Sequence, residues 1–135
     1  MKRKRLKYCI LTCLTSFLLL IACSSNSGEG LNEISVGEVR TMVDNEDESV
    51  FLLDVRTLEE YYGDLGHLPK ATLLPYNEVE SRIAELSEHK DKKIIAYCRS
   101  GRRSAIATKI LIENGFDAYN MTGGMKKWKD EYPSY

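Results

Sequence analysis

The sequence predicts one α/β domain of three layers, with a central, mostly parallel sheet flanked by helices. Two apolar runs, 50–53 and 94–97, have the composition of strands that are buried on both faces. Segments with helical spacing of apolar residues alternate with these runs, as in 77–88. Strands that alternate with helices form βαβ units, and such units join parallel strands with helices on both faces of the sheet.

The first half of the domain carries two helix starts that are marked by capping boxes. Ser35 and Glu38 have the spacing at which each side chain bonds the other residue's backbone N–H. Thr57 and Glu60 repeat this spacing after the predicted strand 50–53. We therefore expect one helix from Ser35 to about Val43 and another that starts at Thr57.

The second half of the domain continues the alternation of strand and helix. The helical segment that follows Cys98 ends at an Asn-Gly pair, which is typical of a helix C-terminus. In chain order, we predict a short strand at 71–74, a helix at 77–88, a strand at 94–97, a helix that ends at 114–115, a strand at 118–121 and a short helix that carries Trp128.

Residues 1–22 have the features of a signal peptide, which sets them apart from the domain. Residues 1–7 are a basic cluster and 8–22 are uncharged, which is the order of a secretory signal. The apolar run is shorter than the roughly 20 residues of a spanning helix. An ordinary signal cleaved near Ala22 and an uncleaved anchor are the alternatives to a lipoprotein signal.

The end of the apolar run, Leu-Ile-Ala-Cys, resembles a bacterial lipobox, in which the cysteine receives the lipid. This resemblance implies that Cys23 carries the acyl chains, palmitate among them, and that 23–32 is a flexible linker before a domain at 33–132. The protein would then be exported and held at the surface of a bacterial cell membrane or outer membrane without spanning it.

Charge and cysteine content limit the partners of the processed chain. Removal of residues 1–22 leaves 14 basic and 20 acidic residues, a formal net charge of −6. Such a chain has no general affinity for nucleic acid, so we expect no nucleic-acid partner. No histidine and cysteine have metal-ligand spacing, and we expect neither a metal nor another cofactor. Lipidation of Cys23 would leave Cys98 as the one unmodified thiol.

Cys98 lies between a predicted strand and a predicted helix, in a setting that favours the thiolate. The helix amino terminus supplies partial positive charge and unpaired N–H groups. Gly101 allows successive N–H groups to turn inward as an anion-binding nest. Arg99, Arg102 and Arg103 add full positive charges. Such settings lower a cysteine pKa from about 8.5 towards roughly 3.5–7.5.

Two other interpretations of this loop compete with a reactive thiol that carries sulfur. A small buried cysteine at a strand end needs no cluster of arginines, and we disfavour it for that reason. Tyrosine phosphatases and arsenate reductases also cradle an anion beside a cysteine, but they place arginine six positions after it. Here Ser104 holds that position, and the arginine comes one residue earlier. The shorter loop encloses a smaller space, which is better matched to a single sulfur atom than to a tetrahedral phosphate.

An ordered series of motifs resembles the rhodanese family of sulfurtransferases. The motifs extend over about residues 33–130, in the order found in that family. They are Leu-Asp-Val-Arg at 53–56, Glu-Tyr at 60–61, Gly-His-Leu-Pro-Lys-Ala at 66–71, Tyr-Cys-Arg-Ser-Gly-Arg-Arg-Ser at 97–104, Gly-Phe at 115–116, Gly-Gly at 123–124 and Trp128. The resemblance implies the rhodanese fold, a three-layer α/β domain.

The resemblance also implies a chemistry for the cysteine loop. Cys98 would take sulfane sulfur from thiosulfate or a related donor, and pass it from a persulfide to a thiol or cyanide. The N–H groups of the loop would hold the sulfur, and its arginines would bind the small sulfur-containing anion. The anion-binding loop consists of Arg99, Ser100, Gly101, Arg102 and Arg103. A sulfur-carrier or partner-binding module without significant turnover is the alternative.

The resemblance also bears on three further positions. Asp54 and Arg56 end the first strand motif, and we expect them to pair and brace the loops rather than to react. Lys70 stands where the family usually has glycine, so the loop around it is expected to differ in shape.

Overall fold

Five parallel strands form the sheet in a computed structural model, which describes residues 30–135. The predicted signal peptide, Cys23 and most of the linker lie outside the described residues. The spatial order is β1-β5-β4-β2-β3, and every neighbouring pair is parallel, as predicted. The strands are β1 Glu33–Ile34, β2 Val50–Asp54, β3 Thr72–Leu73, β4 Lys93–Tyr97 and β5 Asp117–Met121.

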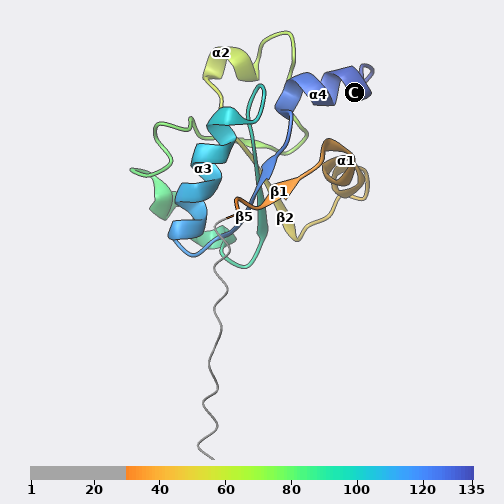
Figure 1. Cartoon of the computed structure of the whole chain (residues 1–135). Coiled ribbons are helices and arrows are strands. Elements are labelled where there is room, and N and C mark those ends of the chain that lie inside the picture. The colour runs from red at the N-terminus through yellow and green to blue at the C-terminus, as the bar shows by residue number, and fades with distance from the viewer. Residues whose placement is uncertain (1–29) are drawn as a thin grey trace, which may run out of the picture.

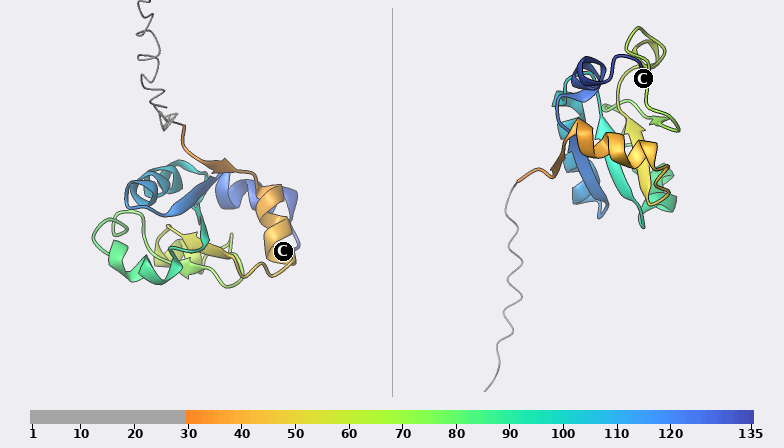
Figure 2. Two further views of the ribbon diagram at one scale, coloured as in Figure 1. Left: turned by 90° about the horizontal axis from the view of Figure 1, so that it is seen from below. Right: turned by 90° about the vertical axis from the view of Figure 1, so that its right-hand side faces the viewer.

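Helices cover both faces of this sheet, which gives the three predicted layers (Figures 1 and 2). α1 and α4 lie on one face, and α3 lies on the other with the 3₁₀ helix η1. α2 lies beyond the carboxyl end of β2. The helices are α1 Val36–Asp44, α2 Leu58–Tyr61, η1 Ile83–His89, α3 Arg102–Glu113 and α4 Gly124–Glu131. Within residues 30–135, no helix has the length and apolar character needed to cross a membrane.

β4 shows how the central strands contribute to two separate cores. Ile94 and Ala96 face α3, whereas Ile95 and Tyr97 face α1 and α4, and all four are fully buried. Successive side chains of a strand point to opposite faces, so a run without polar residues is what burial on both sides requires. Burial of each large apolar side chain contributes about 1.5–3 kcal/mol. Cys98 continues the α3-facing series.

Both predicted capping boxes are present. The Ser35 side chain accepts from the Glu38 N–H, and the Glu38 carboxylate accepts from the Ser35 N–H at 3.0 Å. Thr57 and Glu60 make the same reciprocal pair at the start of α2.

The predicted α-helix at 77–88 is wrong. Turns occupy this segment up to Arg82, and a 3₁₀ helix follows at Ile83–His89. The Ser81 hydroxyl donates to the Glu78 carbonyl at 3.0 Å, a local bond that competes with helical pairing. Ile83 and Leu86 are three residues apart, which places both on one face of a 3₁₀ helix as well as of an α-helix. The apolar spacing therefore did not distinguish the two.

Candidate active site

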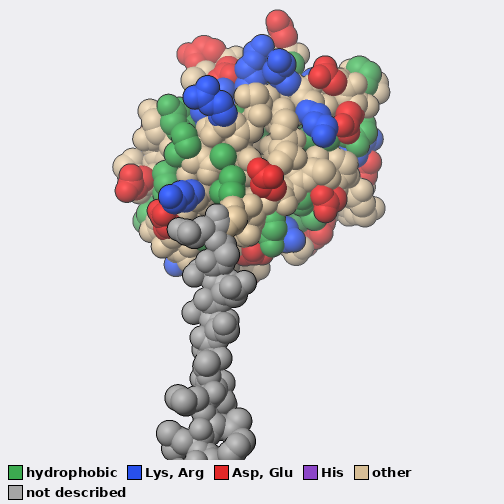
Figure 3. All heavy atoms as spheres, in the orientation of Figure 1, with side chains coloured by type: hydrophobic (Ala, Val, Ile, Leu, Met, Phe, Trp, Pro, Cys, Tyr) green, Lys and Arg blue, Asp and Glu red, His purple; other side chains and the backbone are tan. Residues whose placement is uncertain are grey.

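Cys98 is the first residue of the turn that connects β4 to α3. The residue is 1% exposed, and its sulfur lies on the α3 side of the sheet. The Gly101 N–H donates to Cys98 Sγ at 3.1 Å, and Ser104 Oγ lies 3.4 Å from the same atom. The predicted inward-facing loop is therefore present around the sulfur. Figure 3 shows Lys and Arg side chains at this end of the molecule, near the start of α3, with acidic side chains beside them.

Burial and hydrogen bonding act on the sulfur in opposite directions. Burial is the largest single influence and raises the pKa of the Cys98 thiol. Hydrogen bonds from the Ser104 hydroxyl and from the N–H groups of Ser104, Ser100 and Gly101 together outweigh it, and they lower the pKa below its ordinary value. The thiolate is thus favoured by directed donors at the helix start.

The three arginines of the loop differ in how much they contribute to stabilising the Cys98 thiolate. Arg103 donates to both carboxylate oxygens of Glu60 on α2, at 2.6 and 2.7 Å. This bond lowers the pKa of Glu60 to about 2 and raises the pKa of Arg103, which the charge on Cys98 raises further. Arg99 and Arg102 are exposed. The hydrogen-bond donors are thus the main support of the thiolate, Arg103 adds its charge, and Arg99 and Arg102 face solvent.

α4 fixes the orientation of the peptide groups in the cysteine loop. The Met125 N–H donates to the Cys98 carbonyl at 2.9 Å, and the Lys126 N–H donates to the Arg99 carbonyl at 3.0 Å. In a trans peptide, the C=O and the following N–H point in opposite directions. Anchoring these carbonyls on α4 therefore turns the N–H groups of Arg99 and Ser100 away from α4, towards the sulfur side of the loop.

Gly124 makes this close approach possible. Its φ is +58°, and a Cβ at this position would collide with the backbone carbonyls of Cys98 and Arg99. Gly101 has a φ of +98°, and a Cβ there would come within 3.4 Å of the Gly123 nitrogen. Glycine is the residue that adopts such backbone angles without a Cβ. The glycine pair at 123–124 thus gives the cysteine loop its shape.

Asp54 and Arg56 form the predicted pair, and both are almost completely buried. Arg56 Nε donates to Asp54 Oδ1 at 2.9 Å and Nη2 donates to Oδ2 at 2.6 Å. Nη2 also donates to the Gly66 carbonyl at 2.6 Å. Burial lowers the pKa of Arg56, but the contacts with Asp54 outweigh this effect and raise it. The pair thereby connects the end of β2 to the 66–71 motif.

Two residues of the 66–71 motif have defined surroundings. His67 stacks on Tyr61 with ring centroids 3.7 Å apart, and its Nδ1 lies 3.0 Å from the Tyr61 carbonyl. Lys70 has a φ of +59°, and its Nζ contacts Glu46 Oε2 at 2.8 Å. The lysine therefore adopts the left-handed backbone for which the family's usual glycine is suited.

Sequence reasoning missed Asn120, which lies on β5 and is 4% exposed. Its Oδ1 is 2.6 Å from Ser104 Oγ, so it lies one hydrogen bond away from the group that contacts the sulfur. The available signal was a polar residue at an inward-facing position of the predicted strand 118–121. Buried polar groups in a strand normally have a specific partner.

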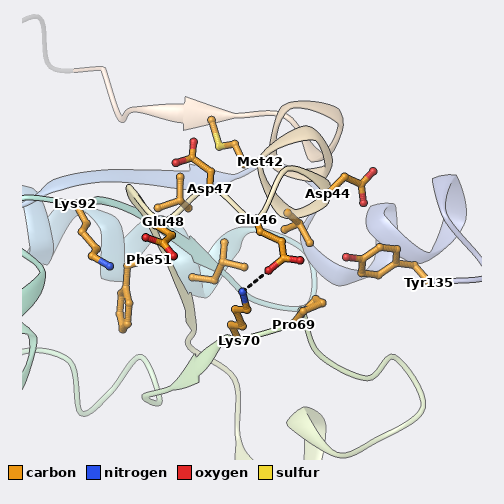
Figure 4. A pocket seen from close by; sticks show the side chains of 13 residues that line it. Met42, Asp44, Glu46, Asp47, Glu48, Phe51, Pro69, Lys70, Lys92 and Tyr135 are labelled. Carbon is orange, nitrogen blue, oxygen red and sulfur yellow. Dashed lines mark hydrogen bonds and ion pairs between the residues drawn. The ribbon is translucent and has the colours of Figure 1, made fainter.

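A separate pocket of about 670 Å³ lies near the amino ends of β2 and β4 (Figure 4). Its lining combines apolar residues such as Met42 and Phe51 with acidic ones such as Asp47. None of the lining residues belongs to the cysteine loop. The chemistry of the thiol and this pocket therefore occupy different parts of the domain.

The parallel three-layer fold and the cysteine loop together define a rhodanese-like domain. The rhodanese-like domain family matches residues 35–131, and the chain belongs to this family. It is accordingly a member of the rhodanese-like sulfurtransferases and sulfur carriers.

Individual relatives place the chain within this family. It is 40% identical over 106 residues to the "Putative sulfur carrier protein YrkF" of Bacillus subtilis, covering 78% of this chain but only 55% of that protein. It is 35% identical over 101 residues to the "Putative sulfurtransferase YtwF" of the same organism, covering 75% of this chain and 93% of YtwF. A crystal structure of a rhodanese-like domain protein from Staphylococcus aureus superposes with a TM-score of 0.65 at 32% identity, covering 76% of this chain and 95% of that one.

Proposed function

We propose that the protein is a sulfurtransferase that moves sulfane sulfur from thiosulfate, or a related donor, to a thiol or cyanide through a Cys98 persulfide. The observation that carries this proposal is the convergence of hydrogen-bond donors on one buried sulfur, with a lowered thiol pKa. A thiolate that is formed before the donor arrives needs no separate protein base.

The two half-reactions follow from this thiolate. Cys98 Sγ attacks the outer sulfur of thiosulfate, the sulfur–sulfur bond of the donor breaks, and its electron pair leaves with sulfite. The negative charge then lies on the terminal sulfur of the persulfide. Cyanide or a thiolate attacks that sulfur, and the bond to Sγ breaks to restore the Cys98 thiolate. The exposed Arg99 and Arg102 are suited to bind the sulfonate end of the donor.

The test uses the full chain in detergent, with thiosulfate as donor and cyanide as acceptor. We expect thiocyanate to form with the wild type and none above background with Cys98→Ser. Intact mass after thiosulfate alone should show one added sulfur atom in the wild type and none in the variant. Equal thiocyanate rates for the two proteins would contradict the proposal.

A sulfur carrier with little turnover is the second candidate, and the similarity to YrkF favours it. A carrier would gain the sulfur atom in the mass measurement but release it slowly to cyanide or a small thiol. A phosphatase would hydrolyse an aryl phosphate instead. The shortened loop before Ser104 disfavours that activity.

For the amino-terminal segment, we propose export and lipid attachment at Cys23. The support is the basic and apolar order of 1–22 and the lipobox-like ending. Metabolic labelling with a palmitate analogue tests this, with Cys23→Ala as the control. Label in the variant, or no label in the wild-type protein, would refute lipidation at this residue.

A further inference from the structure

Ser104 Oγ lies between two buried groups that compete for its single hydrogen. Asn120 Oδ1 is 2.6 Å away and Cys98 Sγ is 3.4 Å away. Ser104 is fully buried, and both neighbours are below 5% exposed. A serine hydroxyl has one hydrogen to donate and two lone pairs that accept. It therefore cannot donate to the amide and to the sulfur at the same time.

The two acceptors of Ser104 suit different charge states of the sulfur. With the amide oxygen towards Ser104, Asn120 competes with Cys98 for the hydroxyl hydrogen, and whenever the hydroxyl donates to Asn120 its lone pairs face Cys98. A thiol S–H can donate to such a lone pair. A thiolate cannot, because it needs a donor.

A half-turn of the Asn120 amide produces the opposite arrangement. The amide oxygen and nitrogen have nearly the same size, so their exchange keeps the packing. Nδ2 would then donate to Ser104 Oγ, and the hydroxyl hydrogen would be released to Cys98 Sγ. Each orientation of the amide thus matches one charge state of the sulfur.

We propose that Asn120 is a positioning residue that acts through Ser104, turning its amide so that the hydroxyl follows the charge on Cys98 Sγ. This inference rests on the proposed function. Sγ is anionic before sulfur is taken up, becomes the neutral bridging atom of the persulfide, and is anionic again after discharge. The thiolate needs the hydroxyl as a donor, whereas the bridging sulfur carries neither charge nor hydrogen and lets the hydroxyl return to Asn120.

The charged groups near the sulfur do not interfere with a test in the range of about pH 5 to 9. Arg103 faces Cys98 from α3 and is bound to Glu60 of α2, whose pKa is about 2. Arg99 and Arg102 belong to the loop and the start of α3, and both side chains are exposed to solvent. Within the described residues, the sulfur is the group here that is expected to titrate.

The experiment follows the Asn120 side-chain amide by NMR in the ¹⁵N-labelled full chain in detergent. We expect its resonance to shift with pH at the same midpoint as alkylation of Cys98 by iodoacetamide, and to shift again on persulfide formation. The exposed Asn114 amide, which donates to the Ile110 carbonyl, is the internal control and should not follow the thiol. In Ser104→Ala, Cys98 should still titrate while the Asn120 amide no longer follows it.

A variant gives an independent measurement. Asn120→Asp removes the donor half of the amide and adds an acceptor, so we expect the midpoint for Cys98 alkylation to rise by about one pH unit, a tenfold change in the acid dissociation constant of the thiol. An Asn120 amide that ignores the charge on Cys98, or one that follows it equally in Ser104→Ala, would overturn the proposal. Because loss of sulfur transfer would leave the amide titration in place, failure of the proposed function is distinguishable from failure of this inference.

Discussion

Replacing Ser104 with alanine removes a side-chain hydroxyl that contacts the Cys98 sulfur. A hydrogen bond to a charged group contributes about 1.5–3 kcal/mol. The 3.4 Å separation and the competition from Asn120 place this bond at or below the lower end of that range. We therefore expect a loss of about 1.4 kcal/mol, which raises the thiol pKa by about one unit. The backbone donors of Ser100 and Gly101 remain in the variant.

The assay is the rate of Cys98 alkylation by iodoacetamide as a function of pH. Ser100→Ala is the matched control, because Ser100 is exposed and supports the thiolate through its backbone N–H. Its alkylation midpoint should equal that of the wild type, whereas Ser104→Ala should be about one unit higher. An unchanged midpoint in Ser104→Ala, or the same rise in both variants, would refute the assignment of the Ser104 hydroxyl as a donor.

Four further predictions concern stability, measured by urea unfolding of the full chain in detergent. Gly124→Ala should lose more than about 2 kcal/mol of unfolding free energy and fail to form persulfide, because its Cβ would meet the loop backbone. Gly66→Ala is the control, since Gly66 has a similar φ but lies in open space, and it should lose only about 1 kcal/mol. Equal losses in the two variants would contradict this explanation. Lys70→Gly should gain about 0.5 kcal/mol of unfolding free energy, because relief of the left-handed backbone outweighs the loss of the exposed ion pair with Glu46. A loss of stability would show that the ion pair contributes more than the backbone does. Thr108→Val should gain about 1 kcal/mol, since the buried Thr108 hydroxyl has no hydrogen-bond partner within residues 30–135; destabilisation would indicate a partner. Glu60→Gln should be less stable than wild type near neutral pH, and the difference in unfolding free energy should shrink as pH falls from about 4.5 to about 2. The reason is that the lowered pKa makes Glu60 bind a proton less strongly in the folded state than in the unfolded state. A difference that does not depend on pH would exclude the ion pair as its cause.

Most of the fold could be predicted because its signals are local. The capping boxes at Ser35 and Thr57 depend only on spacing within one turn, and both are present. The apolar run 94–97 could be assigned to a strand because its side chains are buried on both faces of the sheet. β1 escaped prediction because two residues at a sheet edge carry no periodicity.

The sequence was sufficient to predict the cysteine loop, but not the side chains that form hydrogen bonds near its sulfur. Cys98 and Gly101 could be placed because a strand, a turn and a helix follow one another in the sequence. The hydroxyl of Ser104 and the amide of Asn120 meet only when α3 packs on β5, which no local pattern indicates. Burial of the sulfur was likewise a property of the assembled core, so its opposing effect on the pKa could not be weighed beforehand.

The bonds from Met125 and Lys126 to the carbonyls of Cys98 and Arg99 have a consequence for how the protein is made. The cysteine precedes in the chain the residues that hold its loop in shape, so the loop is completed only when α4 has docked. Before that step the inward-facing N–H groups are not held in place, and we expect the thiol to be less acidic than in the folded domain. The reactivity of this cysteine is therefore coupled to the folding of the last helix.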